Sequence, residues 1–260
     1  MWKFFIHLLV ICVLTVISQV GGIIYGLVFL MLRKRHILTR LSIFMLIYLL
    51  ISFFLLPPLA KLGGRVPITS GEWVRPVSAY VYLLNRNYVK PELNQVLQDQ
   101  AEKLQRTHPG IQLVYLDAGF PFWEEFPLLP HRSHNDGEKV DLAFIYQKNG
   151  TLLNDKPSLS GYGVFEEPKN QERITTPRCL REGYWWYDYN KYATFWTLDP
   201  DISVHGPATA TLMRNLIQDR RVGKILLEPH LVNRWKLDKR KARFHGCYAV
   251  RHDDHVHVQL

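Results

Sequence analysis

Two short stretches of the sequence concentrate the residue types that bind metal ions. The first runs from His131 to Asp141 and the second from His252 to His257, and together they hold five of the 11 histidines. Imidazole nitrogens and carboxylate oxygens are ligands of catalytic zinc, which takes three protein ligands and keeps a fourth position for water. These residue types predict a metal site of the catalytic kind.

The spacing within each stretch brings side chains together. His255 and His257 are two residues apart, so on a strand they project from the same face. His134 and Asp141 are separated by six residues, and Gly137 between them allows a tight turn. A loop imidazole and a strand carboxylate can therefore converge on one metal. Taken singly, each of these residues is also an ordinary strand histidine or turn aspartate.

Both helices and strands must position these side chains. Hydrophobic periodicity and turn signals predict helices over Trp73–Leu84, Pro91–His108 and Pro207–Arg221, and strands over Ile111–Leu116, Val140–Tyr146, Lys224–Glu228 and His255–Leu260. Asn149-Gly150 marks a hairpin turn whose partner strand is Thr151–Leu153. This order of elements predicts an α+β domain with an antiparallel sheet.

Two uncharged segments precede this domain. Phe4–Leu32 and Leu41–Ala60 contain no Asp, Glu, Lys or Arg, and a membrane span needs about 20 mostly apolar residues. We therefore expect a transmembrane helical hairpin over residues 1–60, a linker over 61–70, and a globular domain over 71–260.

The basic loop Arg33–Arg40 predicts the orientation, because four of its eight residues are Lys or Arg. The positive-inside rule places this loop in the cytoplasm, so the N-terminus and the domain would lie on the periplasmic or extracellular side of the cytoplasmic membrane. The apolar run of Phe4–Leu32 is too long for a signal peptide, and no A-x-A-like cleavage site ends it.

The formal net charge of +9 has its origin partly in this anchor. Residues 1–60 hold five basic residues and no acidic ones, which leaves 27 basic and 23 acidic residues in the rest of the chain. Such a small excess argues against a nucleic-acid partner. Cys179 and Cys247 would form one disulfide in an oxidising compartment, or else remain two buried thiols.

An aromatic segment, Tyr184–Trp196, carries eight rings. It could form the wall of a substrate groove. Ring-rich segments more often pack into a core, so we expect these rings to be buried, with one or two exceptions.

The two histidine stretches resemble the zinc peptidase superfamily of D-Ala-D-Ala metallopeptidases, lysostaphin-type enzymes and hedgehog domains. The first motif consists of Ser133, His134, Gly137 and Asp141, and the second is His255-x-His257. The similarity is closest to penicillin-insensitive murein endopeptidases, which share the phrase Pro130–His134 and the His-x-x-His-x-His ending that starts here at His252. The resemblance covers residues 111–260 in patches and leaves out the membrane segments.

This resemblance implies an antiparallel sheet with helices on one side, and one zinc ion bound by His134, Asp141 and His257. His255 would face the reaction centre without binding the metal. The implied function is hydrolysis of peptide bonds in peptidoglycan, at cross-links or stems that contain D-amino acids. A D,D-carboxypeptidase or dipeptidase, or a non-catalytic zinc-containing peptidoglycan-binding module, are the alternatives.

The general base is less well defined by these motifs. Asp254 occupies the position where dipeptidase-like relatives hold a catalytic carboxylate, but murein endopeptidases do not rely on one there. His252 or His255 could act as the base instead, or stabilise the oxyanion. On a regular strand Asp254 would point away from His257, so a turn or bulge is required.

His131 and Arg132 flank the expected site and would contact substrate. The planar guanidinium of Arg132 suits a bidentate contact with a substrate carboxylate, although an internal salt bridge explains it equally well.

Overall fold

The computed structural model describes residues 2–129, 131, 133–196 and 199–260, and the chain divides into two compact units. The first unit consists of Met1–Ile68, Ala79–Pro91 and Ala118–Glu138. The second consists of Thr69–Ser78, Glu92–Asp117 and Lys139–Leu260. The first unit therefore contains two segments of the predicted globular domain in addition to the predicted anchor.

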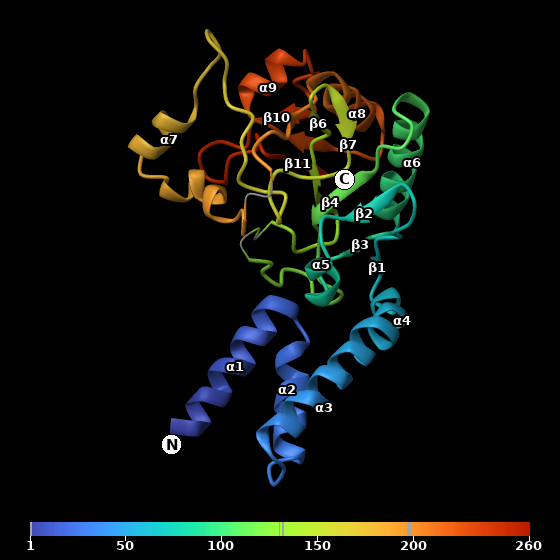
Figure 1. Cartoon of the computed structure of the whole chain (residues 1–260), viewed down its shortest axis with the longest axis vertical. Coiled ribbons are helices and arrows are strands. Elements are labelled where there is room, and N and C mark those ends of the chain that lie inside the picture. The colour runs from blue at the N-terminus through green and yellow to red at the C-terminus, as the bar shows by residue number, and fades with distance from the viewer. Residues whose placement is uncertain (1, 130, 132, 197–198) are drawn as a thin grey trace. The chain divides into compact units, whose positions relative to one another are not determined.

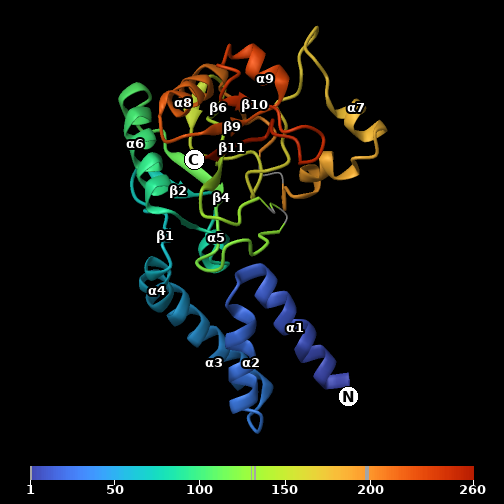
Figure 2. The same cartoon turned by 180° about the vertical axis from the view of Figure 1, so that it is seen from behind.

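The first unit begins with apolar helices that reverse direction one after another (Figures 1 and 2). They are α1 (Trp2–Ser18), α2 (Gly21–Met31) and α3 (Ile37–Leu50), which continues through a π-helical turn (Ile51–Leu55) into α4 (Leu56–Leu62). Of the described residues, Ile37–Leu62 forms the one helical run that is long and apolar enough to cross a membrane. It includes the second predicted span.

The first predicted span, Phe4–Leu32, is broken in two. Gln19 adopts a φ of 66° between α1 and α2, and the Ser18 Oγ accepts a hydrogen bond from Gly21 N at 3.1 Å. A Cβ atom on Gly22 would lie 2.0 Å from Thr15 Oγ1, so the close approach of α1 and α2 requires glycine there. The expectation of one helix was wrong because charge counting ignores uncharged polar residues that can end a helix.

The remainder of the first unit is small. The strand β1 (Val66–Pro67) pairs antiparallel with β3 (Tyr88–Val89), and α5 (Tyr80–Leu83) forms a single turn. The segment 118–138 contains no helix or strand of its own among its described residues. The helix predicted over Trp73–Leu84 is therefore reduced to α5, because Pro76 closes a short strand instead of continuing a helix.

A six-stranded mixed sheet forms the centre of the second unit, in the order β10-β9-β11-β5-β4-β2. Its strands are β2 (Val74–Pro76), β4 (Leu113–Asp117), β5 (Lys139–Ala143), β9 (Lys224–Leu226), β10 (Ala242–Arg243) and β11 (His255–Gln259). The three central pairs are antiparallel as predicted, whereas the edge pairs β10–β9 and β2–β4 are parallel. The α+β class is confirmed, and the purely antiparallel sheet is wrong.

Helices and a smaller sheet complete this unit. The helices are α6 (Pro91–Thr107), α7 (Thr176–Arg181), α8 (Gly206–Gln218) and α9 (Pro229–Arg234), and the second sheet pairs β7 (Thr151–Leu153), β6 (Tyr146–Lys148) and β8 (Ser203–Val204). Both long predicted helices are confirmed as α6 and α8. The predicted hairpin is confirmed as β6–β7, with positive φ at Asn149 and Gly150, as its tight turn requires.

The aromatic segment lies on a separate excursion of the second unit, which Figure 1 shows as α7 and the 3₁₀ helix that follows it (Trp185–Tyr192). The Cys179–Cys247 disulfide is present and is packed against the buried Tyr187. The expected burial of the rings is wrong: six of the eight are exposed, namely Trp185, Trp186, Tyr189, Tyr192, Phe195 and Trp196. A short 3₁₀ helix has too few inward-facing positions to bury more of these rings.

Candidate metal centre

The register of two neighbouring strands aligns three of the expected site residues. His257 on β11 lies directly opposite Asp141 on β5, and His255 lies opposite Ala143. Residues opposite each other in an antiparallel pair share one face, as do residues two apart on one strand. Asp141, His255 and His257 therefore project from the same face of the sheet, as the sequence spacing predicted for the two histidines.

The Asp141 carboxylate lies at the centre of a group of buried polar side chains. Its Oδ1 lies 2.9 Å from His257 Nδ1, and its Oδ2 accepts a hydrogen bond from the Tyr162 hydroxyl at 2.8 Å. His255 Nε2 lies 3.7 Å from the same Oδ2. All four side chains are buried, so the carboxylate is held in one orientation by imidazole and phenol groups rather than by solvent.

His131 and His134 lie on the segment that precedes β5. The His134 amide donates to the His131 carbonyl at 3.0 Å, and their rings are 5.5 Å apart between centroids. His134 Nδ1 lies 2.9 Å from the Ala118 carbonyl oxygen, which can only accept, so Nδ1 carries the proton and Nε2 is the nitrogen that could bind a metal. Gly137 has a φ of +75°, as the predicted turn requires.

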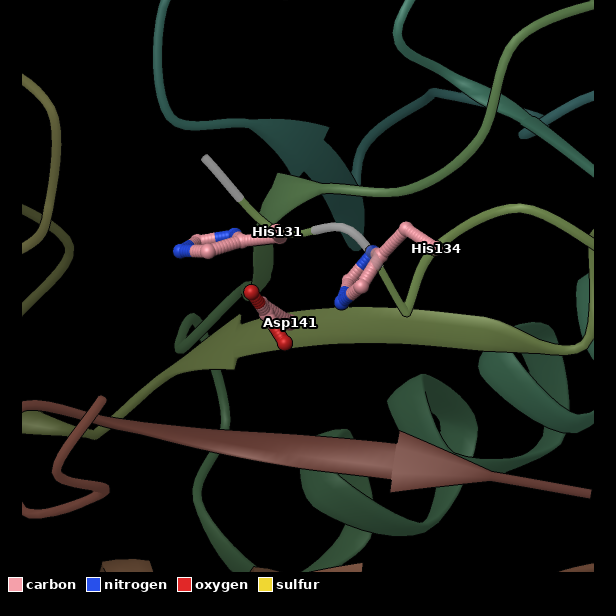
Figure 3. A group of neighbouring side chains, drawn as sticks. All are labelled: His131, His134 and Asp141. Carbon is pink, nitrogen blue, oxygen red and sulfur yellow. The ribbon is translucent and has the colours of Figure 1, made fainter. Parts of the chain in front are cut away.

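His131, His134 and Asp141 form a buried group that could hold a metal ion (Figure 3). Each offers one ligand atom, and these atoms lie within 4.8 Å of one another. In Figure 3 the carboxylate of Asp141 projects from β5 toward the two rings. The structure thus brings His134 and Asp141 together as expected and adds His131, for which the sequence predicted a substrate contact. The role of His257 as third ligand stays a prediction.

The donor set fits a zinc ion. Nitrogen and carboxylate oxygen donors are the usual ligands of catalytic zinc sites. Outer partners of the kind that orient such ligands are present as well, because the Ala118 carbonyl faces His134 and the Tyr162 hydroxyl faces Asp141.

Asp254 directly precedes β11 and is fully buried. Its Oδ1 contacts His255 Nδ1. Its Oδ2 accepts hydrogen bonds from Gly163 N at 2.6 Å and from Asn190 Nδ2 at 3.3 Å. With both oxygens engaged in this way, the carboxylate orients the His255 ring, whose Nε2 is then directed toward Asp141.

The remaining histidines of the second stretch differ in charge. Burial lowers the pKa of His255, but the neighbouring Asp254 and Asp141 carboxylates more than compensate and raise it to about 8. Burial, followed by the proximity of His255 and His257, lowers the pKa of His252 well below its usual value. His252 is therefore neutral near pH 7. Its ring centroid lies 5.0 Å from that of His255.

Sequence reasoning missed three polar residues of this region: Tyr162, Asn190 and Asp117. The signal for Tyr162 is its position between two glycines with φ of 80° and 83°. A Cβ on Gly161 would lie 2.4 Å from Leu116 Cδ2, and one on Gly163 would lie 2.4 Å from Asn190 O. Gly161 thus lets the turn approach β4 closely, and Gly163 lets it approach the 3₁₀ helix. Asp117 ends β4 directly opposite Asp141, a register that no local pattern reveals.

Arg132, the second residue expected to contact substrate, lies outside the described residues, as does Pro130 of the same motif.

No family model matches the chain, and a search of curated proteins finds no match either. The arrangement of side chains on β5, on β11 and in the segment before β5 is therefore the basis for a functional assignment, together with the motifs that those side chains form.

Proposed function

We propose that this chain is a membrane-anchored zinc metallopeptidase that hydrolyses peptide bonds in peptidoglycan. The observation that carries the proposal is the buried His131–His134–Asp141 group, with His257 and His255 on the same sheet face as Asp141. The superfamily motifs described above support peptidoglycan as the substrate, because the same residues form them.

One zinc ion would be held by His134, Asp141 and a second histidine. The motif resemblance favours His257, whose Nδ1 lies 2.9 Å from Asp141 Oδ1, while the grouping of ligand atoms favours His131. When bound, the zinc supplies Lewis acidity, which lowers the pKa of a bound water and polarises the scissile carbonyl.

His255 is the better candidate for proton transfer, in place of Asp254. Both Asp254 carboxylate oxygens are engaged by buried donors, whereas His255 directs Nε2 toward the Asp141 carboxylate. In its neutral form, whose fraction rises with pH through the raised pKa of about 8, His255 would accept a proton at Nε2 from the attacking water and return it to the leaving amine. Asp254 holds the ring and its tautomer, and is thus a positioning residue.

The apolar helices support a membrane location. The run Ile37–Leu62 would cross the bilayer, with the basic loop Arg33–Arg40 in the cytoplasm. Because α1 and α2 reverse direction, the start of α1 lies at the same end of the hairpin as this loop (Figures 1 and 2). The N-terminus would then be cytoplasmic as well, contrary to the sequence-based topology, while the chain that follows Leu62 would lie outside.

The decisive experiment uses the full-length protein in detergent. It is incubated with purified peptidoglycan, with a chelator, and after zinc is restored, and the released fragments are identified by mass spectrometry. We expect chelator-sensitive conversion of cross-linked dimers to monomers. Loss of terminal D-alanine alone would indicate a carboxypeptidase, and binding without cleavage would indicate a non-catalytic module. The variant His134→Ala should lose both metal and cleavage, whereas His108→Ala, outside the group, should keep both.

A second experiment separates Asp254 from His255. The variants Asp254→Asn and His255→Gln should each keep zinc and lower kcat by about 100-fold, the lower end for loss of an acid–base group. The double variant should be little worse than either single one, because the two residues act as a unit. Full activity of the Asp254→Asn protein would show that Asp254 does not position His255 for catalysis.

A further inference from the structure

Gln19 lies at the turn between α1 and α2. Its side chain joins this turn to the backbone of Phe122, which is far away in the sequence. Its Nε2 donates to the Phe122 carbonyl at 2.6 Å, and Phe122 N donates to its Oε1 at 2.8 Å. The two residues are 103 positions apart in the sequence. The side-chain amide thus satisfies both backbone groups of one residue, as a neighbouring strand would, and Gln19 is itself fully buried.

Neighbouring contacts support this junction. Asn85 Nδ2 donates to the Ser18 carbonyl and to the Tyr48 hydroxyl, each at 3.2 Å. The Tyr48 hydroxyl donates to the Leu83 carbonyl at 2.6 Å. The ring of Phe122 also packs against the apolar cluster formed by the helices of the first unit. The turn is therefore held by several buried contacts.

Phe122 belongs to the same segment as His131 and His134, and the described residues of this segment form an isolated bridge between Gly119 and Tyr88 but no strand. Its ends are tied by Arg65, whose Nη1 donates to the Phe120 carbonyl at 2.6 Å and whose Nη2 donates to the Asn135 carbonyl at 3.0 Å. Contacts from outside the segment therefore replace the regular hydrogen bonds that a helix or strand would supply.

We propose that the α1–α2 turn is a structural part of the metal site, and that Gln19 is a positioning residue that holds the segment bearing His131 and His134. This inference rests on the proposed metal site and assigns a role to the apolar hairpin beyond anchoring. A chain that lacks the hairpin would lose the Gln19 contacts, so its histidine segment would be less ordered and its metal affinity lower.

The test uses the full-length protein in lipid nanodiscs. The variant Gln19→Met keeps the side-chain length and removes both hydrogen bonds, while Gln19→Glu keeps only the acceptor for Phe122 N. The matched control is Ser18→Ala, which changes the same turn but removes no contact with Phe122. Hydrogen exchange of residues 118–138 and zinc affinity, by competition with a chelator, are measured for each protein.

We expect Gln19→Met to increase exchange across 118–138, leave the strands of the six-stranded sheet protected, and weaken zinc binding roughly tenfold. Gln19→Glu should have a smaller effect, and Ser18→Ala none on the segment. Equal exchange and equal zinc affinity in Gln19→Met and the unchanged protein would overturn the inference. So would identical effects of Gln19→Met and Ser18→Ala, which would indicate general loosening of the hairpin.

These readouts also separate the inference from the proposed function. If the unchanged protein binds no zinc, the metallopeptidase proposal fails, while hydrogen exchange still decides whether Gln19 holds the segment. If zinc binds and the Gln19 variants exchange normally, the inference fails and the metallopeptidase proposal is unaffected.

Discussion

The two histidine stretches are held by different kinds of structure. The second ends on β11, where hydrogen bonds to β5 on one side and β9 on the other determine the position of His257. In the first stretch, His131 and His134 lie in a segment whose described residues form no strand, where His134 contacts the Ala118 carbonyl and Arg65 ties the backbone.

The kind of support determines which substitutions each stretch tolerates. A strand inside a sheet is held by many equivalent hydrogen bonds, so the loss of one distant side chain disturbs it little. A segment held by a few long-range contacts depends on each of them, because no regular pattern compensates when one is lost.

The largest effect should come from the disulfide that precedes the second stretch. Replacing Cys179 and Cys247 by serine removes a cross-link that spans 68 residues, and should lower the free energy of unfolding by about 4 kcal/mol. Zinc affinity should stay within about twofold, because the ladder of β11 remains. Denaturant unfolding and chelator competition measure the two quantities. A large loss of affinity would show that the second stretch also depends on distant support.

Asp141 lies where both stretches meet, so its loss should affect the site most directly. Asp141→Asn should weaken zinc binding by more than about 100-fold, which exceeds the usual cost of losing an outer partner. Asp136→Asn is the control, because that carboxylate accepts a hydrogen bond from Glu138 N within the turn and is not a member of the metal group. Similar affinities in the two variants, by chelator competition, would exclude Asp141 as a ligand.

Arg65 tests the support of the first stretch. Lysine cannot reach both the Phe120 and Asn135 carbonyls as the guanidinium does, so Arg65→Lys should lower zinc affinity about tenfold. The control is Arg75→Lys, which also loses a donor to a carbonyl, that of Asn154, but outside the histidine stretches. Equal affinity in both variants, by the same competition, would contradict the dependence of the first stretch on long-range ties.

Tyr162 should show the smallest effect. Tyr162→Phe removes one hydrogen bond to a carboxylate that the strand already positions, so zinc affinity should fall about fivefold. Tyr146→Phe is the matched control, because its hydroxyl donates to the Asp254 backbone carbonyl at 3.5 Å and not to a carboxylate of the metal group. Isothermal titration with zinc compares the two. A loss as large as that of Asp141→Asn would mean that Tyr162 acts as more than an outer partner.

The sequence by itself determined the features that depend on local patterns. The helical period of Pro91–His108, the Asn149-Gly150 turn and the alternation at His255–His257 each correspond to an observed element, because neighbouring residues largely decide such elements. The presence of two histidine stretches and the pairing of His134 with Asp141 also followed from residue type and short spacing.

Only the tertiary structure decided the features that join distant residues. The break at Gln19, the contact of Tyr162 with Asp141 and the engagement of Asp254 by Gly163 and His255 depend on packing between segments far apart in the chain. The physical reason is that a buried polar group must find a partner wherever the fold supplies one. Residue order along the chain does not specify that partner.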